Sequence, residues 1–353
     1  MRIGIALATF NGEEFLAEQL QSIRGQRRLP NEMLVVDDAS SDRTWEMLHE
    51  FQRTAPFEVT LFQNAVRQGP KASFLRAMDA CRSEAIAFCD QDDMWREDKL
   101  AVCEDILAKR GARLVVHSLA HLRSRGLRWT ISDRTSLPTK TVDGLHLRPE
   151  RMFRGMSMMF WKYVIERSTE IQSLWEDRFR AIEAQREVSI LDHWTHAHDL
   201  LVLMVARLLG DVSLLRATLA YQRWHGGNYT GMPEEPRRRP LAGSGMAIDN
   251  VSSQRSYGLL SQFCADMGSF LREVRAQTAL PPERLEYAAK VYEQWAVIYA
   301  ARARLHSVGT SLPTRIAVLR ELAAAGGYRG EFAGGLGKKS LLKDALKSVR
   351  PTG

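Results

Sequence analysis

Short apolar runs alternate with amphipathic stretches along the first 120 residues. Four such runs predict strands at residues 3–8, 33–36, 59–62 and 85–89. The spacing of apolar positions between them predicts helices at residues 13–24, from a cap at 40–42 to residue 51, and at 73–81. Strand–helix alternation of this kind predicts a mostly parallel central sheet with helices on both faces.

The remainder of the chain has a less regular pattern. Residues 156–161 and 213–224 are predicted strands, and residues 198–209 are a predicted helix. The polar, Arg-rich stretch 120–150 is predicted to be a loop region, and the Pro-, Arg- and Gly-rich stretch 232–245 a linker. Two helices are expected at residues 252–274 and 281–305, and an amphipathic segment at 338–350. We therefore expect a boundary near residue 235, followed by a mainly helical extension over 236–353.

Composition places the chain among globular proteins. It has 353 residues, of which 45% are hydrophobic and 26% charged, which is enough apolar material for one large domain or two modest ones. Four cysteines without C-x-x-C spacing indicate reduced, buried thiols rather than a disulfide framework. Without an uncharged apolar run of membrane-spanning length or a signal-peptide pattern, the expected location is cytoplasmic.

Positive charge is concentrated at the end of the chain. Residues 1–235 contain 31 Lys and Arg against 33 Asp and Glu, whereas residues 236–353 contain 18 against 9. A protein that binds nucleic acid over its whole surface would not divide its charge in this way, so no nucleic-acid partner is expected. The basic extension could instead lie on an anionic membrane surface, or it could be a solvated helical region packed on the rest of the chain.

An acidic sequence, Asp90-Gln91-Asp92-Asp93, directly follows the fourth predicted strand. Three carboxylates so close together repel one another unless a cation is present. Oxygen donors of this kind suit Mg²⁺ or Mn²⁺, which could also hold a diphosphate. The alternative is a solvated turn whose aspartates cap the next helix.

Three further positions are candidates for chemistry. Asp38, at the end of the second predicted strand, could accept from a base or a ribose, although Asp and Ser there are also ordinary turn residues. Asp199 opens a predicted helix, where it could be a cap or a general base. Arg223 and His225 follow the last predicted strand and could reach a diphosphate and its metal, although a single histidine is usually structural.

Several other chemistries lack their motifs. The chain contains no P-loop and no G-x-G-x-x-G fingerprint. Residues 155–159 lack the second glycine of a nucleophile elbow, and H-E-x-x-H is absent beside the three histidines at 193, 196 and 198.

Taken together, these motifs resemble family 2 glycosyltransferases, most of all the rhamnosyltransferase-like branch. The resemblance covers residues 1 to about 232 and is carried by Ala6–Leu16, Val35–Asp42, Asp90–Trp95, Phe153–Phe160, His198-Asp199 and Arg223–Asn228. It implies a glycosyltransferase-A fold over residues 1–235, with a nucleotide-binding half at 1–115 and an acceptor-binding half at 116–235.

The resemblance also implies roles for individual residues. Those contacting the donor would be Ala8, Thr9 and Phe10 at the nucleobase, and Asp38 as the carboxylate that recognises it. Asp90 and Asp92 would form the family's D-x-D pair, beside the diphosphate that Arg223 could reach. Asp92 and His225 would be metal ligands, and Asp199 the catalytic base.

The activity implied by the resemblance is inverting, metal-dependent transfer of a sugar, with rhamnose favoured, from a dTDP- or UDP-linked donor. The acceptor would be a hydroxyl of a glycan or a lipid-linked molecule in bacterial surface polysaccharide synthesis. Two alternatives remain at this stage. One is a nucleotide-sugar-binding module without turnover. The other is a sugar-nucleotide pyrophosphorylase, which the acidic sequence Thr9–Glu14 disfavours because that enzyme needs a basic Gly-rich loop there.

Overall fold

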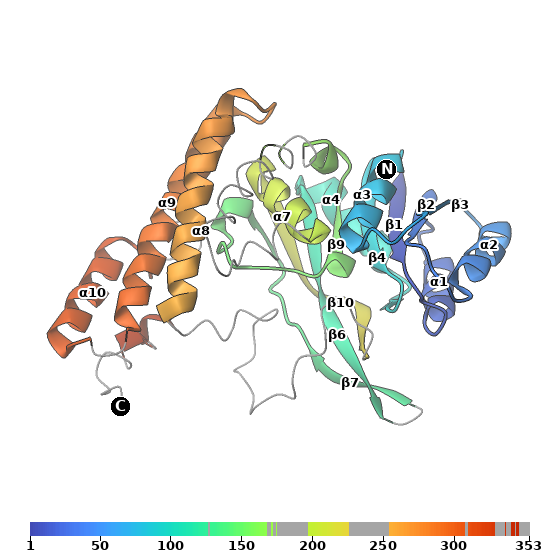
Figure 1. Ribbon diagram of the computed structural model, residues 1–353, viewed down its shortest axis with the longest axis horizontal. Coiled ribbons are helices and arrows are strands. Elements are labelled where there is room, and N and C mark those ends of the chain that lie inside the picture. Colours follow the sequence, from blue (N-terminus) through green and yellow to red (C-terminus); the bar gives the residue numbers. More distant parts are fainter. Residues whose placement is uncertain are drawn as a thin grey trace.

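The computed structural model describes residues 1–125, 128–167, 197–225, 254–307 and 310–328, with isolated positions at 171, 174, 336, 340–342 and 344–345. Within these residues a ten-stranded sheet forms the centre, and three long helices lie along one side of it (Figure 1). The predicted linker at 232–245 and most of the segment 338–350 lie outside the described residues.

The first four strands are parallel and adjacent. They are β1 (Ile3–Thr9), β2 (Glu32–Asp37), β3 (Glu58–Gln63) and β4 (Ala85–Asp90), in the order β3-β2-β1-β4. The helices α1 (Leu16–Arg24), α2 (Thr44–Thr54) and α3 (Pro70–Ala80) connect them. The predicted alternation is confirmed. β1, β2 and β4 are almost fully buried because helices cover both faces of the sheet, whereas the edge strand β3 is partly exposed.

The sheet becomes mixed beyond β4. Next to β4 lie β9 (Met158–Trp161), β6 (Leu114–Arg125), β10 (Asp211–Trp224) and the short β5 (Met94–Trp95). β9 is antiparallel to both of its neighbours, whereas β6 and β10 are parallel to each other. Two helices not yet named complete this half, α4 (Lys99–Arg110) and α7 (His198–Leu209).

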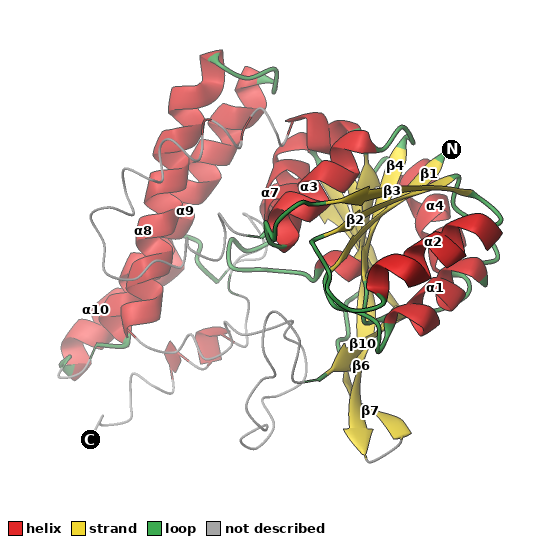
Figure 2. Ribbon diagram, turned by 45° about the vertical axis from the view of Figure 1, so that its right-hand side comes forward, coloured by secondary structure: helices red, strands yellow, loops and turns green. Residues whose placement is uncertain are grey.

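The prediction of a loop region over residues 120–150 was wrong. β6 continues to Arg125, β7 (Arg128–Arg134) pairs with it, and β8 (Lys140–Asp143) pairs with β10. The end of β6 and all of β7 form a hairpin that extends beyond the rest of the sheet (Figure 1, Figure 2). Because that hairpin projects from the core, its strands carry no continuous apolar run, and the hydrophobic pattern does not reveal them.

Two apolar clusters lie on the two faces of the sheet. One face packs against α1, α2 and α4 through residues such as Leu20, Leu48 and Leu107. The other packs against α3 and α7. The second cluster continues without a break into α8 (Gln254–Glu273) and α9 (Pro282–Leu305), which contribute Phe263 and Trp295. The helical region is therefore packed onto the sheet-bearing part through a shared core.

Polar contacts reinforce that junction. Arg284 at the start of α9 donates to the carbonyl oxygen of Leu208 at 2.9 Å and makes two bonds to Asp143, at 2.6 and 2.7 Å. α10 (Leu312–Ala324), which the sequence pattern did not predict, packs on α9. None of the helices in the described part of the chain is long and apolar enough to cross a membrane.

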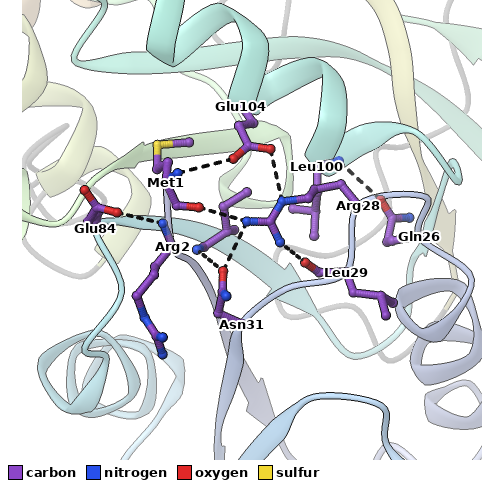
Figure 3. Close-up of polar contacts among 10 residues, drawn as sticks. Met1, Arg2, Gln26, Arg28, Leu29, Asn31, Glu84, Leu100 and Glu104 are labelled. Carbon is purple, nitrogen blue, oxygen red and sulfur yellow. Dashed lines mark hydrogen bonds and ion pairs between the residues drawn. The ribbon is translucent and has the colours of Figure 1, made fainter.

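At the amino-terminal ends of the strands, Arg28 organises a network that joins three segments (Figure 3). Its guanidinium donates to Glu104 of α4 at 3.1 Å, to the carbonyl oxygen of Met1 at 2.8 Å and to Asn31 Oδ1 at 3.1 Å. Asn31 Oδ1 also accepts the Ile3 N–H at 2.9 Å. These contacts fix the edge of the sheet opposite to the candidate active site.

Candidate active site

The parallel strands β1, β2, β3 and β4 end at the same edge of the sheet. In the register, Thr9 lies beside Asp37, Asp37 beside Gln63, and Ala8 beside Asp90. The Thr9 hydroxyl donates to Asp37 Oδ1 at 2.9 Å, and both side chains are buried. Ligands of open α/β sheets bind outside this edge, so the polar residues here form the candidate site.

The loops after β1 and β2 are bonded to each other. Asn11 and Ala39 adopt the left-handed conformation, with φ of 46° and 61°. The Asn11 side-chain oxygen accepts the Ser41 N–H at 2.9 Å, and the Gly12 N–H donates to Thr44 Oγ1 at 2.7 Å. A Cβ at Gly12 would lie 2.4 Å from Gln91 Oε1, so a larger residue there would displace the Gln91 side chain.

Phe10 presents an aromatic ring at this edge. The Gln91 amide holds its backbone in both directions, accepting the Phe10 N–H at 2.8 Å and donating to the Phe10 carbonyl at 3.0 Å. The guanidinium carbon of Arg67 lies 4.0 Å from the centre of the Phe10 ring. Of the predicted neighbours, Ala8 is partly exposed and Thr9 is buried. A flat, fixed ring of this kind can stack on a nucleobase.

Asp38 holds the segment that carries Arg67. Its carboxylate accepts the Asn64 side-chain amide at 2.8 Å, the Gln68 N–H at 2.8 Å and the Gly69 N–H at 2.7 Å. Burial alone would raise the pKa of Asp38, but these three donors outweigh it and hold the pKa below its usual range. Asp38 is therefore an anchor for residues 64–69, and its contact with a nucleobase stays a prediction.

The acidic sequence after β4 concentrates negative charge. Burial, together with the nearby Asp92 and Asp199 carboxylates, raises the pKa of Asp90 to about 7. Asp93 is 1% exposed; its Oδ1 accepts the Arg223 N–H at 3.1 Å, and its Oδ2 has no hydrogen-bond partner among the described residues. Burial and the charges of Asp92 and Asp90 raise its pKa as well. A cation at this position would relieve the repulsion.

His225 is brought to the acidic sequence by strand pairing. β5 pairs antiparallel with β10 through Ala220 opposite Trp95 and Tyr221 opposite Met94. The end of β10 therefore lies beside the acidic residues, and His225 Nε2 is 2.9 Å from Asp92 Oδ2. The His225 ring also packs on Phe15, with ring centres 4.5 Å apart.

Arg223 is positioned behind the acidic sequence. Its side chain is 1% exposed, forms an ion pair with Glu18 and donates to the Asp92 carbonyl oxygen at 3.3 Å. Its backbone N–H binds Asp93, as described above. The observed role of Arg223 is therefore to support the acidic sequence, and its contact with a diphosphate stays a prediction.

Asp199 lies in the first turn of α7, whose predicted bounds are confirmed. Its Oδ2 accepts the Gly155 N–H at 3.0 Å and its Oδ1 accepts the Leu200 N–H at 2.9 Å, which fixes the orientation of the carboxylate. Its neighbour His198 stacks on Phe74 with ring centres 3.8 Å apart, and burial lowers its pKa to about 4. His198 is therefore a neutral packing residue, while the histidines at 193 and 196 lie outside the described residues.

Two cationic residues at the site were not predicted from the sequence. Lys99, which is fully buried, donates to the Met156 carbonyl oxygen at 2.7 Å and lies 3.5 Å from the centre of the Trp95 ring. Burial lowers the pKa of Lys99 to about 8 and also lowers that of Arg154, which interacts electrostatically with Asp199 and Asp90. Arg154 belongs to the motif Phe153-Arg154-Gly155, which is a signal for a site residue, whereas nothing in the local sequence distinguishes Lys99 from other lysines.

The donor set fits a divalent cation only in part. In the residues that the structure describes, no group of three His, Cys, Asp or Glu side chains is arranged to hold a metal ion. Asp92 and His225 nevertheless meet at 2.9 Å, and the next residue, Asp93, has an Oδ2 atom without a hydrogen-bond partner among the described residues. Mg²⁺ is commonly held by one or two carboxylates, with water and substrate phosphates completing its coordination. The residues therefore fit a site that a bound diphosphate would complete.

Comparison with known proteins agrees with the fold. Residues 5–168 match the family described as Glycosyl transferase family 2. An uncharacterized glycosyltransferase of Nostoc sp. is 23% identical over 229 residues, which cover 65% of this chain and 66% of the relative. The dTDP-rhamnosyl transferase RfbG of Shigella flexneri is 31% identical over 110 residues, which cover 30% of this chain and 38% of the relative. The matched regions thus span less than two thirds of the full length of either curated relative.

Among solved structures, the crystal structure of S. aureus TarS residues 1–349 in complex with UDP matches with a TM-score of 0.50 and 16% identity. The match covers 88% of this chain and 93% of the TarS chain. It confirms the expected fold class, an α/β sheet of the glycosyltransferase-A type followed by helices.

Proposed function

We propose that this chain, whose residues 5–168 match glycosyl transferase family 2, transfers a sugar from a nucleoside-diphosphate donor to an acceptor hydroxyl during polysaccharide synthesis. The observation that carries this proposal is the meeting of the acidic sequence 90–93 with Asp199 at one edge of the sheet, where Asp199 contributes to the raised pKa of Asp90. A donor-binding group and a candidate base are thus within electrostatic reach of each other.

The donor would lie along the carboxyl edge of β1, β2 and β4. Phe10 offers a ring for stacking, backed by Arg67. Asp38, whose carboxylate anchors the segment that carries Arg67, would recognise the base. Asp90 would lie near the diphosphate. A dTDP-linked deoxysugar such as rhamnose is the favoured donor, because a matched relative is described as a dTDP-rhamnosyl transferase. UDP-linked sugars are the alternative, since the TarS structure contains UDP.

Asp92 and His225 would hold a divalent cation, Mg²⁺ or Mn²⁺. When bound, such an ion supplies Lewis-acid stabilisation of the charge that develops on the leaving diphosphate. The protein's own contribution is to fix the two donors: strand pairing between β5 and β10 positions His225, and the Arg223 contacts hold the backbone of the acidic sequence.

Asp199 would act as the general base. The Gly155 and Leu200 N–H groups orient its carboxylate, so that it can take the proton of an acceptor hydroxyl as the oxygen attacks the anomeric carbon. Attack from the face opposite the leaving diphosphate inverts the configuration at that carbon. Arg154 and Lys99 would offset part of the negative charge around the reacting groups.

The proposal also covers the arrangement of the chain. Residues 1–235 would form the catalytic part, with 1–115 binding the donor and 116–235 the acceptor, and residues 236–353 would be a basic helical extension. The protein would act in the cytoplasm, with the extension resting on the anionic inner face of the membrane where lipid-linked acceptors are found. That placement is supported by the 18 Lys and Arg against 9 Asp and Glu in residues 236–353.

Asp199→Asn distinguishes an enzyme from a module that only binds nucleotide sugars. Donor hydrolysis or transfer should fall by ~10²–10⁴-fold, while the affinity for the donor stays within a small factor of the wild-type value. Asp211→Asn, an exposed aspartate at the start of β10, is the matched control and should leave turnover unchanged. A wild-type protein that binds donor but never turns it over with any acceptor would support the binding module instead.

A further inference from the structure

The hairpin formed by the end of β6 and by β7 has no part in the chemistry described so far. We refer to residues 121–125 and 128–134 as the arginine hairpin. It projects from the sheet in the same direction as the carboxyl ends of the parallel strands (Figure 1, Figure 2). Its sequence contains four arginines against a single acidic residue, Asp133; the arginines are Arg123, Arg125, Arg128 and Arg134. This positive charge contrasts with the acidic site beside it.

Arg123 is held in place on this hairpin. In the sheet register it lies beside Trp224 of β10 and opposite Thr130 of β7, so the three side chains share one face. The guanidinium carbon of Arg123 is 5.8 Å from the centre of the Trp224 ring. The Trp224 indole N–H donates to His121 Nδ1 at 2.8 Å, which fixes the ring. Arg123 and Trp224 are both half-buried, so each retains solvent-facing surface.

The hairpin also begins next to the acidic site. Trp224 directly precedes His225, whose Nε2 is 2.9 Å from Asp92. The acidic residues repel an anionic acceptor, so an acceptor that carries negative charge needs a cationic group outside them. Arg123, on β6 beside Trp224, is a partly exposed cationic group of this kind, whereas Arg223 is buried against Glu18.

We propose that the arginine hairpin binds a phosphate- or carboxylate-bearing glycan acceptor, a specificity that rests on the glycosyltransferase function proposed above. Arg123 would pair with the anionic group, because guanidinium geometry matches phosphate and carboxylate oxygens. Trp224 would contact the apolar face of an adjacent sugar ring. A membrane surface fits the hairpin less well, because segments that lie on membranes bury a whole apolar face. On the described part of the hairpin the exposed large apolar side chain is that of Ile131 alone, at 46%.

The test compares charged and neutral probes of equal length by isothermal titration. The probes are a ribitol-phosphate oligomer, an oligogalacturonate and a neutral malto-oligosaccharide. Wild-type protein should bind an anionic probe more tightly than the neutral one, with an affinity that falls as salt is added. Whichever anionic probe binds more tightly identifies phosphate or carboxylate as the recognised group.

Variants then locate the binding. Arg123→Gln should weaken anionic binding by about tenfold, the effect of removing one charged hydrogen-bonding partner. Arg123→Lys should weaken it less, because it keeps the charge but loses the two-pronged geometry. Arg216→Gln is the matched control, since Arg216 is an exposed arginine on the neighbouring strand β10, away from the hairpin. Affinity for UDP or dTDP should be unchanged in all three variants.

Three results would overturn the inference. The first is equal binding of charged and neutral probes, or no binding of either. The second is an Arg123→Gln variant that behaves like Arg216→Gln. The third is an Arg123→Gln variant that still binds the oligomers like the wild type but no longer binds phosphatidylglycerol vesicles. In each case, retained nucleotide binding would leave the glycosyltransferase function standing, whereas a wild-type protein that binds no nucleotide would refute that function separately.

Discussion

The contact between His225 and Asp92 offers a quantitative test of the diphosphate site. His225→Phe keeps a ring against Phe15 but removes Nε2, which lies 2.9 Å from Asp92. If His225 helps to hold the cation and diphosphate, its loss should weaken nucleotide binding in the presence of Mn²⁺ by about 10–100-fold, the usual effect of losing a group at a metal site.

That loss has a calculable effect on thermal unfolding. A nucleotide present at 100 times its wild-type dissociation constant stabilises the folded protein by about 2.7 kcal/mol. The same concentration is only about one to ten times the dissociation constant of the variant, so the stabilisation falls to about 0.4–1.4 kcal/mol. The assay is thermal unfolding with UDP, dTDP or GDP, each with Mn²⁺ or EDTA.

A matched control is available on α2. His49 is exposed and packs edge-on against Trp45 with ring centres 4.7 Å apart, so His49→Phe makes the same substitution far from the acidic sequence. It should leave the nucleotide-dependent stabilisation unchanged. An unchanged stabilisation in His225→Phe as well would refute the assignment of His225 to the donor site.

Three further predictions concern stability and reactivity. Arg207→Met should lower the free energy of unfolding, measured by urea titration, by about 3 kcal/mol. The buried guanidinium donates to three carbonyl oxygens, including that of Gly144 at 3.1 Å, and the variant loses all three bonds. A loss below about 1 kcal/mol would contradict this reasoning. The pKa of Asp38 is lowered in the folded state, so the ionised carboxylate stabilises the fold above its unfolded pKa, and this stabilisation is lost as the pH falls through the folded pKa. In Asp38→Asn, the free energy of unfolding in urea should therefore depend less on pH in the acid range. Burial raises the pKa of Cys81 and of Cys103 to about 12, and all four cysteines are buried. Thiol reagents at pH 8 should therefore label the native protein negligibly, but should label all four cysteines in urea. Rapid labelling of the native protein would contradict this, because it would show that the core opens.

Local pattern was sufficient for the first four strands and the three helices between them, whereas α4 was not predicted. α7 was predicted to the residue because its apolar face repeats at helical spacing and Gly210, with φ of 151°, ends it. α10 was missed because its sequence lacks a clear polar face. β5 was missed because its two residues become a strand only through pairing with β10, some 125 residues further along the chain.

The candidate site follows the same division. The sequence indicated that Asp90, Asp92, Asp199 and His225 belong near one another, but not which atoms they contact. The bonds of Asp38 to the backbone of Gln68 and Gly69 could not be predicted, because every residue but proline offers the same N–H. The ion pair of Arg223 with Glu18 joins residues 205 positions apart, a contact that only the folded sheet creates.

The central claim is that Asp199 performs chemistry on a sugar held at the edge of the sheet. The most direct measurement is product formation from dTDP- and UDP-linked sugars with Mn²⁺, in wild-type protein and in Asp199→Asn, with donor affinity measured alongside. The account predicts a product with inverted anomeric configuration from the wild type, ~10²–10⁴-fold less from the variant, and nearly equal donor binding by both. Equal turnover by the two proteins, or a product with retained configuration, would contradict it.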